Sequence, residues 1–232
     1  MKKIGIIGAM EVEVKELISL LEEREEKQIA GLKFYEGMIS EKNVVVVQSG
    51  ISKVNAAMCT QILISEFNVD AIVNTGVAGA LHDELDVLDV VISTEAIEYD
   101  VDATAFGYKM GEIPGMDNSI FVADTQLIDS AYNSFDKKEL KHKILKGRVV
   151  TGDKFVSDKA SKDRLRKEFD GYCCEMEGGA IAHVASLNKI PFVIIRSISD
   201  KADGSADMTY NEFVNIAATN SKNMVVNMLK KI

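Results

Sequence analysis

The sequence predicts an α/β fold, and two patterns carry this prediction. Short apolar, β-branched runs alternate along the chain with segments whose apolar residues recur at helical spacing. The runs are apolar throughout rather than at every second position, which indicates strands that are buried on both faces of a sheet. Helices must cover such a sheet, and 232 residues with 47% hydrophobic content suffice for one large core.

The elements follow one another without a break in this pattern. Strands are expected at residues 3–9, 43–50, 70–76, 89–93, 147–153 and 191–200. Helices are expected at residues 54–67, 162–169 and 211–232, and an acidic, helix-like stretch after the first strand puts Arg24 on a Glu-rich helical surface. The chain has only two prolines, no Ser/Gly-rich linker and no repeat, so we expect a single domain over residues 1–232.

The charge and the cysteines exclude several classes of protein. A net charge of −9 without a long basic stripe argues against a nucleic-acid surface. The first apolar run is too short for a membrane span and lacks a signal-peptide cleavage pattern, so no membrane partner is expected. The three cysteines, Cys59, Cys173 and Cys174, lack metal-ligand spacing and are interpreted as reduced core thiols of a cytoplasmic protein.

Acidic residues follow several of the expected strands, at the ends where α/β proteins carry their sites. Glu11 and Glu13 follow the first strand, and Asp200 ends the last one. Taken alone, the two glutamates are explained as first-turn helix acids, and Asp200 as a cap or turn residue. The glycine segment at 74–80 is likewise explained as a tight strand-to-helix turn.

Glu175 and Glu177 are harder to explain structurally. In extended backbone they point to the same face, so their charges crowd one site unless ligand hydroxyls, a cation or a shared proton relieves them. Arg196, on the last expected strand, is one candidate cation.

Seven short motifs occur in order along almost the whole chain: GAMEVEV, SGISKVNAA, NTGVAGA, DATAFGY, TGDKFV, EMEGGAIA and IRSISD. Together they closely resemble the 5′-methylthioadenosine/S-adenosylhomocysteine nucleosidases of the nucleoside phosphorylase superfamily. The resemblance implies a three-layer α/β/α domain with a mixed, mostly buried central sheet. It also implies a hydrolase that releases adenine from methylthioadenosine, S-adenosylhomocysteine and 5′-deoxyadenosine, in methionine salvage.

The resemblance assigns the catalytic roles. Adenine is a poor anionic leaving group, so an acid must protonate its N7, while negative charge and a water must meet the oxocarbenium-like sugar. Asp200 matches the general acid. Glu13 matches the carboxylate that activates the water, helped by Glu175 and Arg196, and Glu177 matches the group that binds the ribose hydroxyls.

The same resemblance implies the remaining ligand contacts. Phe155 is expected to stack on adenine, the Val156 backbone to bind its edge, and Met10, Ile51 and Tyr210 to surround the 5′ thioether. The other expected contacts are Val77, Ala78, Gly79, Met176 beneath the sugar, and Ser199, which aligns Asp200. Without the resemblance, Phe155 would be interpreted as a core aromatic.

A homodimer is implied as well, in which residues 99–115 complete the pocket of the neighbouring subunit through Ala103, Phe106 and Pro114. The apolar side chains of this segment would otherwise be costly to expose. No cofactor and no metal is expected, because the histidines have no cysteine or acid at ligand spacing; these are His82, His142 and His183.

Three positions depart from the family pattern. Val77 stands where serine is common, Tyr210 where phenylalanine is common, and Lys154 where a small residue is usual. The loss of the serine hydroxyl bears on the water and ribose region, and Lys154 is expected to point to solvent.

Three alternatives remain open at this point. A phosphorylase of the same fold would use phosphate, but Arg24 is the only arginine before Arg148, and lysines such as Lys53 match phosphate less well than guanidinium. A 6-amino-6-deoxyfutalosine hydrolase would keep the hydrolytic groups and differ in the 5′ pocket. A non-enzymatic nucleoside-binding module would lack the acid and the base.

Overall fold

The computed structural model describes residues 1–134 and 142–232, and in these residues ten strands join into one sheet. The strands are β1 (Lys3–Gly8), β2 (Glu22–Ile29), β3 (Leu32–Ile39), β4 (Lys42–Gln48), β5 (Ala71–Ala80), β6 (Val90–Glu98), β7 (Phe121–Val122), β8 (Ile144–Thr151), β9 (Gly171–Glu175) and β10 (Phe192–Asp200). The helices are α1 (Glu11–Ser19), α2 (Lys53–Phe67), α3 (Thr125–Tyr132), α4 (Lys159–Phe169), α5 (Gly178–Leu187) and α6 (Ala206–Leu229), with a short 3₁₀ turn at Thr104–Phe106.

The sheet is mixed, and half of it curls back on itself. β5 pairs in parallel with β1 and β10, and antiparallel with β9. β10, β6, β8 and β9 then pair in that order, which closes a ring of strands on β5. β1, β4, β3 and β2 extend from the other side of β5 as an open sheet. β5 is therefore shared by the ring and the open sheet, and it is buried along its whole length.

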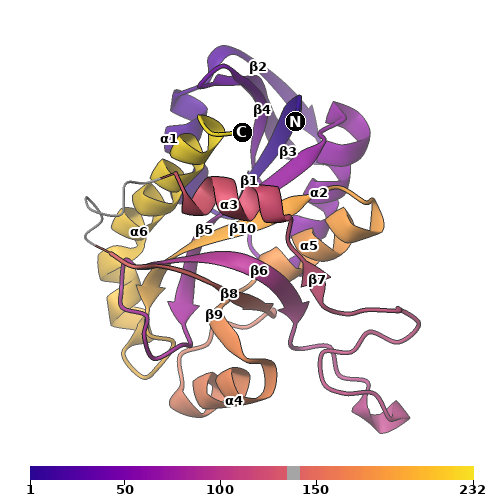
Figure 1. The fold of residues 1–232 in the computed structure, drawn as a ribbon, viewed down its shortest axis with the longest axis vertical. Helices are drawn as coiled ribbons and strands as arrows, with labels where there is room; N and C mark the ends of the chain where they lie inside the picture. The colour runs from indigo at the N-terminus through magenta and orange to yellow at the C-terminus, as the bar shows by residue number, and fades with distance from the viewer. Residues whose placement is uncertain (135–141) are drawn as a thin grey trace.

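Helices cover the sheet on both sides, which confirms the predicted α/β class with three layers (Figure 1). α6 packs on β5 and β10 and contacts α1 and α3, while α2 and α5 pack together on the opposite side. The core consists of β-branched side chains from the central strands, as the apolar runs predict. No helix in the described parts of the chain is long and apolar enough to cross a membrane.

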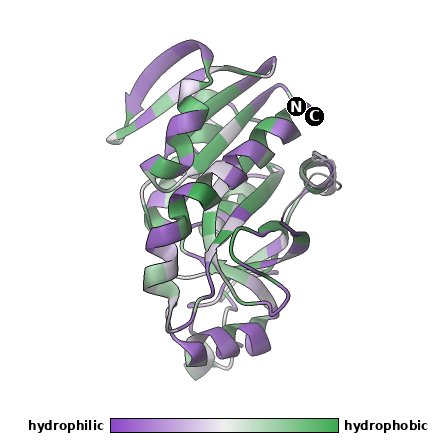
Figure 2. Cartoon of the chain, turned by 90° about the vertical axis from the view of Figure 1, so that its left-hand side faces the viewer, coloured by the Kyte–Doolittle hydropathy of each residue, from purple (hydrophilic) through white to green (hydrophobic). Residues whose placement is uncertain are grey.

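Two predictions about individual elements are wrong. The acidic stretch after α1 is not helical: residues 22–29 form β2, an exposed edge strand in a hairpin with β3, and Arg24 lies on this strand. The charged outermost strand is visible as the hydrophilic band at the top of Figure 2. Charged side chains on an edge strand discourage pairing with a second sheet, and they hide the strand from a search for apolar runs.

The glycine segment at 74–80 also differs from its interpretation as a turn. It continues β5 to Ala80, and no helix follows it. Gly76 pairs with Arg196 and Gly79 with Asp200 on β10. The glycines therefore lie inside a strand, which is typical of places where another group approaches the backbone closely.

Candidate active site

A cavity of about 600 Å³ opens at the ends of β1, β5, β9 and β10. This volume is in the range of small-ligand sites. It is lined by Ala9, Met10, Glu13, Ile51, Val77, Ala78, Gly79, Phe155, Cys174, Glu175, Met176, Glu177, Ser199, Asp200, Tyr210 and Asn211.

Glu13 is held rigidly at one side of the cavity. It lies in the first turn of α1, and its Oε2 accepts hydrogen bonds from the backbone N–H groups of Ala9 (2.7 Å) and Met10 (2.9 Å). Its Oε1 accepts a third from Val77 N (3.0 Å). Burial raises the pKa of Glu13, against the opposing effects of Arg196 and of these three amides. The carboxyl is thus fixed in place and made more basic than an exposed glutamate.

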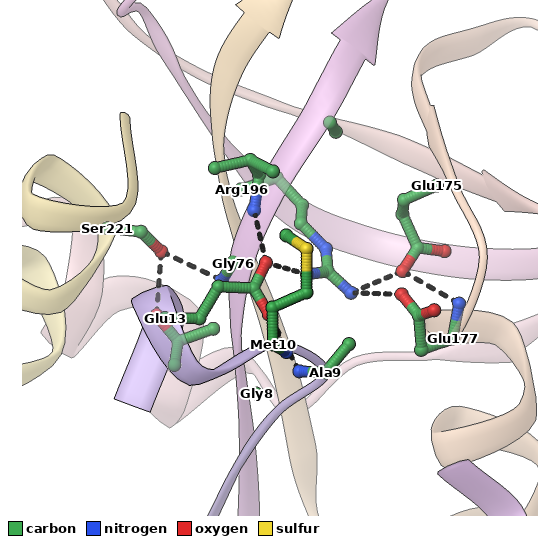
Figure 3. A network of polar contacts seen from close by, with 12 residues as sticks. Gly8, Ala9, Met10, Glu13, Gly76, Glu175, Glu177, Arg196 and Ser221 are labelled. Carbon is green, nitrogen blue, oxygen red and sulfur yellow. Dashed lines mark hydrogen bonds and ion pairs between the residues drawn. The ribbon is translucent and has the colours of Figure 1, made fainter. Parts of the chain in front are cut away.

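Arg196 is the cation beneath the cavity. Its guanidinium is fully buried and lies between Glu13 on one side and Glu175 and Glu177 on the other (Figure 3). Nη2 forms an ion pair with Glu175 Oε2 and donates to Asn74 Oδ1 (2.6 Å). Nη1 lies 4.0 Å from Glu13 Oε1 and has no hydrogen-bond partner, so one face of a buried cation is left facing Glu13.

Glu175 has all its acceptor positions occupied by donors. Oε2 accepts the ion pair from Arg196 and hydrogen bonds from the N–H groups of Gly178 (2.7 Å) and Glu177 (3.2 Å). Oε1 accepts from the hydroxyl of Thr151, which in turn accepts from Gly179 N (2.6 Å). This carboxylate therefore anchors Arg196 to the start of α5.

Glu177 is less fully bound. Oε1 accepts one hydrogen bond, from Ser52 N (2.9 Å), and Oε2 lies 3.8 Å from Arg196 Nη2. Burial and the neighbouring Glu175 raise the pKa of Glu177 to about 7. The expectation that both glutamates lie on one extended strand is wrong, because β9 ends at Glu175 and Glu177 has φ −134° and ψ −42° just before α5. The two carboxylates nevertheless meet at the same guanidinium.

Asp200 ends β10 and lies apart from the Arg196 cluster in its hydrogen bonding. Oδ2 accepts from the Ser199 hydroxyl (2.8 Å) and Oδ1 from Ala202 N (2.8 Å). Burial raises the pKa of Asp200, and these two hydrogen bonds only partly oppose it. The thiol of Cys174 borders the same pocket next to Gly79. Such a carboxyl holds a proton to higher pH than an exposed aspartate does.

The remaining walls are aromatic and apolar. Phe155 is 43% exposed and meets Tyr210 edge to face, with ring centroids 5.8 Å apart. The Tyr210 hydroxyl lies 3.2 Å from Met10 Sδ, so the start of α6 contacts the turn before α1 across the cavity. An exposed aromatic face beside apolar side chains suits a flat, hydrophobic ligand group.

Most of the residues expected at the site from the sequence lie together here. Arg196 lies directly beneath the lining, and Val156 lines a small hollow that adjoins Phe155 and Asp200. The sequence analysis missed Ala9, Cys174 and Asn211, each of which adjoins a predicted residue in the chain. Lys154 also borders the small hollow, and its ammonium lies near Asp158 (3.5 Å) on an exposed surface.

Three expected residues do not line the cavity of their own chain. Ala103 is buried, whereas Pro114 is exposed and Phe106 is 84% exposed. Residues 99–115 extend away from the sheet beyond β6 (Figure 1). No group of three or more metal-binding side chains occurs within the residues described.

Comparison with known proteins identifies the class to which this fold and cavity belong. The model of the phosphorylase superfamily matches residues 3–230. The chain is 44% identical over 230 residues to the 5′-methylthioadenosine/S-adenosylhomocysteine nucleosidase of Staphylococcus carnosus, covering 99% of this chain and 100% of the relative. The structure of the nucleosidase of Neisseria meningitidis, in complex with methylthio-immucillin-A, is 40% identical with a TM-score of 0.96 and full coverage of both chains.

A third relative, the nucleosidase of Colwellia psychrerythraea in complex with adenine, is 40% identical with a TM-score of 0.94, covering 100% of this chain and 97% of the other. The chain therefore belongs to the phosphorylase superfamily and, within it, to the 5′-methylthioadenosine/S-adenosylhomocysteine nucleosidase family.

Proposed function

We propose that the chain hydrolyses the N-glycosidic bond of 5′-methylthioadenosine, S-adenosylhomocysteine and 5′-deoxyadenosine, releasing adenine and the 5-substituted ribose. One observation carries this proposal. A single cavity holds a buried, separately bonded aspartic acid, Asp200, together with a cluster of three carboxylates around one arginine. Glycoside hydrolysis requires an acid for the leaving group and negative charge with a base for the sugar and the water.

Asp200 supplies the proton. Its raised pKa keeps the carboxyl protonated closer to neutral pH, and the Ser199 hydroxyl and Ala202 N–H fix its orientation. Protonation of adenine N7 removes the negative charge from the leaving base, which lowers the barrier to cleavage of the C–N bond.

Glu13 acts on the attacking water as general base. Three backbone amides hold its carboxylate in a fixed orientation beside the unpartnered Nη1 of Arg196. Glu175 contributes by orienting Arg196, because its own oxygens are occupied by donors. Negative charge concentrated here favours the oxocarbenium-like transition state over the neutral substrate.

The rest of the cavity binds the other parts of the nucleoside. Glu177 accepts the ribose hydroxyls, with Met176 beneath the sugar and the backbone of Val77, Ala78 and Gly79 along one wall. Phe155 stacks on adenine, and Val156 binds its edge. The 5′ group lies among Met10, Ile51 and Tyr210, whose apolar and polarisable atoms suit a thioether.

Phosphorolysis is a weaker candidate. Phosphate needs free cations, but the one arginine at the cavity is bound to Glu175 and Asn74 and surrounded by carboxylates. Lys53 does not replace it, because its ammonium is paired with Glu98 (3.0 Å) and Asp100 (2.6 Å). Three carboxylates near the nucleophile would repel a dianion and favour neutral water.

The proposal extends to the whole chain and its assembly. Residues 1–232 act as one nucleosidase domain in the cytoplasm, without a cofactor. The chain forms a homodimer in which residues 99–115 complete the neighbouring pocket, and the exposure of Phe106 supports this assignment.

A panel of nucleosides tests the proposal. Purified protein is incubated with methylthioadenosine, S-adenosylhomocysteine, 5′-deoxyadenosine and 6-amino-6-deoxyfutalosine, and free adenine is measured. We expect adenine from the first three, with the two thioethers cleaved most efficiently. Adenine release from the futalosine derivative alone would contradict the assigned substrate, and no release from any of them would contradict the activity.

A further inference from the structure

Ser52 has a backbone conformation that serine rarely adopts. It precedes α2 with φ 93° and ψ 153°, a region populated almost only by glycine, and its side chain makes no capping hydrogen bond. Its amide nevertheless donates to Glu177 Oε1, 2.9 Å away. The strained residue therefore presents its N–H to a carboxylate of the active site.

Lys53 holds this turn in place through four contacts at its two ends. Its backbone N–H donates to Asp153 Oδ1 (2.9 Å), and its ammonium pairs with Asp100 Oδ1 (2.6 Å) and Glu98 Oε2 (3.0 Å). Asp153 N in turn donates to Asp100 Oδ2 (3.0 Å), and Glu98 Oε1 pairs with His183 Nδ1 (2.9 Å). We call Lys53, Glu98, Asp100 and Asp153 the Lys53 clamp. It ties the start of α2 to the end of β6 and to the turn after β8.

A strained backbone persists only where its surroundings overdetermine it. We infer that Lys53 is a positioning residue: the Lys53 clamp holds Ser52 in its strained conformation and so keeps the Ser52 amide on Glu177. Without the clamp, Ser52 relaxes toward negative φ and its N–H turns away. Glu177 then loses its one hydrogen-bond donor, since its other polar neighbour, Arg196, is 3.8 Å away.

This inference rests on the proposed function, in which Glu177 accepts the ribose hydroxyls. Ribose binding contributes equally in the ground state and the transition state to the extent that the hydroxyls do not react, so its loss appears mainly in KM. For Lys53→Met we expect a KM for methylthioadenosine that is higher by ~10-fold, the scale of a lost hydrogen bond to a charged group, with kcat within ~3-fold. The inhibition constant of adenine should stay unchanged, because adenine has no ribose.

Glycine tests whether Lys53 acts through Ser52, because glycine adopts positive φ without strain. Ser52→Gly alone should match the parent protein, and Ser52→Gly combined with Lys53→Met should return KM to within ~3-fold of the parent value. Lys159→Met is the matched control: its ammonium pairs with Asp163 on the surface of α4, and its KM should not change.

The outcomes separate this inference from the proposed function. If the parent protein cleaves no nucleoside, the function is wrong. If the parent is active but Lys53→Met keeps its KM, or weakens adenine binding equally, or is not restored by Ser52→Gly, the role of Lys53 is wrong. Should Lys53→Met fail to fold, Asp100→Asn weakens the same clamp; a rise in KM that Ser52→Gly reverses is then expected, and its absence overturns the inference.

Discussion

Glu13 and Arg196 face each other across the backbone of Gly76, with Glu13 Oε1 and Arg196 Nη1 4.0 Å apart. A Cβ atom at Gly76 would lie 2.1 Å from Arg196 Nη1 and 2.3 Å from Glu13 Oε1. The Gly76 N–H is also bound by Ser221 of α6 (3.1 Å), so the backbone cannot move aside freely (Figure 3). The distance between base and cation therefore depends on the absence of a side chain at this position.

Gly76→Ala should consequently leave a folded protein with kcat lowered by at least ~100-fold, because misplacement of a catalytic group by about 1 Å has effects of this size. Gly204→Ala is the control, since an added Cβ meets nothing within 4 Å there. Steady-state kinetics with methylthioadenosine measure both variants. Equal activity of Gly76→Ala and the control would show that the spacing of Glu13 and Arg196 is not critical.

The acid and the base should be separately essential. Asp200→Asn cannot donate a proton to N7, and Glu13→Gln cannot accept one from water, so each should lower adenine release by at least ~100-fold. Circular dichroism should show that both variants fold. Near-normal turnover by either variant would refute the role assigned to that residue.

Glu177 should lower the stability of the protein at alkaline pH. Its pKa of about 7 in the folded protein lies above the ordinary value of 4.5, because burial and Glu175 disfavour the charged form. The protein therefore loses stability as the pH rises through about 7, where the buried carboxyl ionises.

Glu177→Gln removes this loss, and its amide oxygen can still accept from Ser52 N. We expect its Tm to exceed that of the parent by at least ~3 °C at pH 8, with a smaller difference near pH 5. Thermal unfolding at the two pH values measures this. A difference that is the same at both would mean that Glu177 does not titrate near neutrality.

Assembly can be tested at Phe106, which is 84% exposed in the single chain. In the proposed dimer, Phe106→Asp would bring an unpaired charge into an apolar contact. Dimerisation should weaken and KM should rise together, by sedimentation and by kinetics on the same samples. A fully active monomer of the parent protein would rule out a shared pocket.

Much of the fold could be predicted because buried parallel strands are apolar throughout. β1, β4, β5 and β10 all announce themselves in this way. β2 does not, since its sequence EEREEKQI has no buried face and its strand conformation comes from pairing with β3. The continuation of β5 beyond Gly76 was likewise hidden, because its pairing with β10 and β9 is a tertiary contact.

The site was predictable to a similar degree. Motifs along the chain indicate which acids belong together, but not how their oxygens are used. That Glu175 is saturated by Thr151, Arg196 and the start of α5, whereas Glu177 depends on Ser52, follows only from the fold. The unusual φ of Ser52 left no trace in the sequence, since serine is an ordinary residue before a helix.

The nature of the nucleophile is the most direct test of the account. Arg196 is occupied by Glu175, and Glu13 lies beside it, so the site should use water and have no place for phosphate. The measurement is adenine release from methylthioadenosine in phosphate-free buffer, with the sugar product identified by mass spectrometry. We predict the full rate without phosphate, and free 5-methylthioribose as product. Turnover that depends strictly on added phosphate and yields a sugar 1-phosphate would contradict the account.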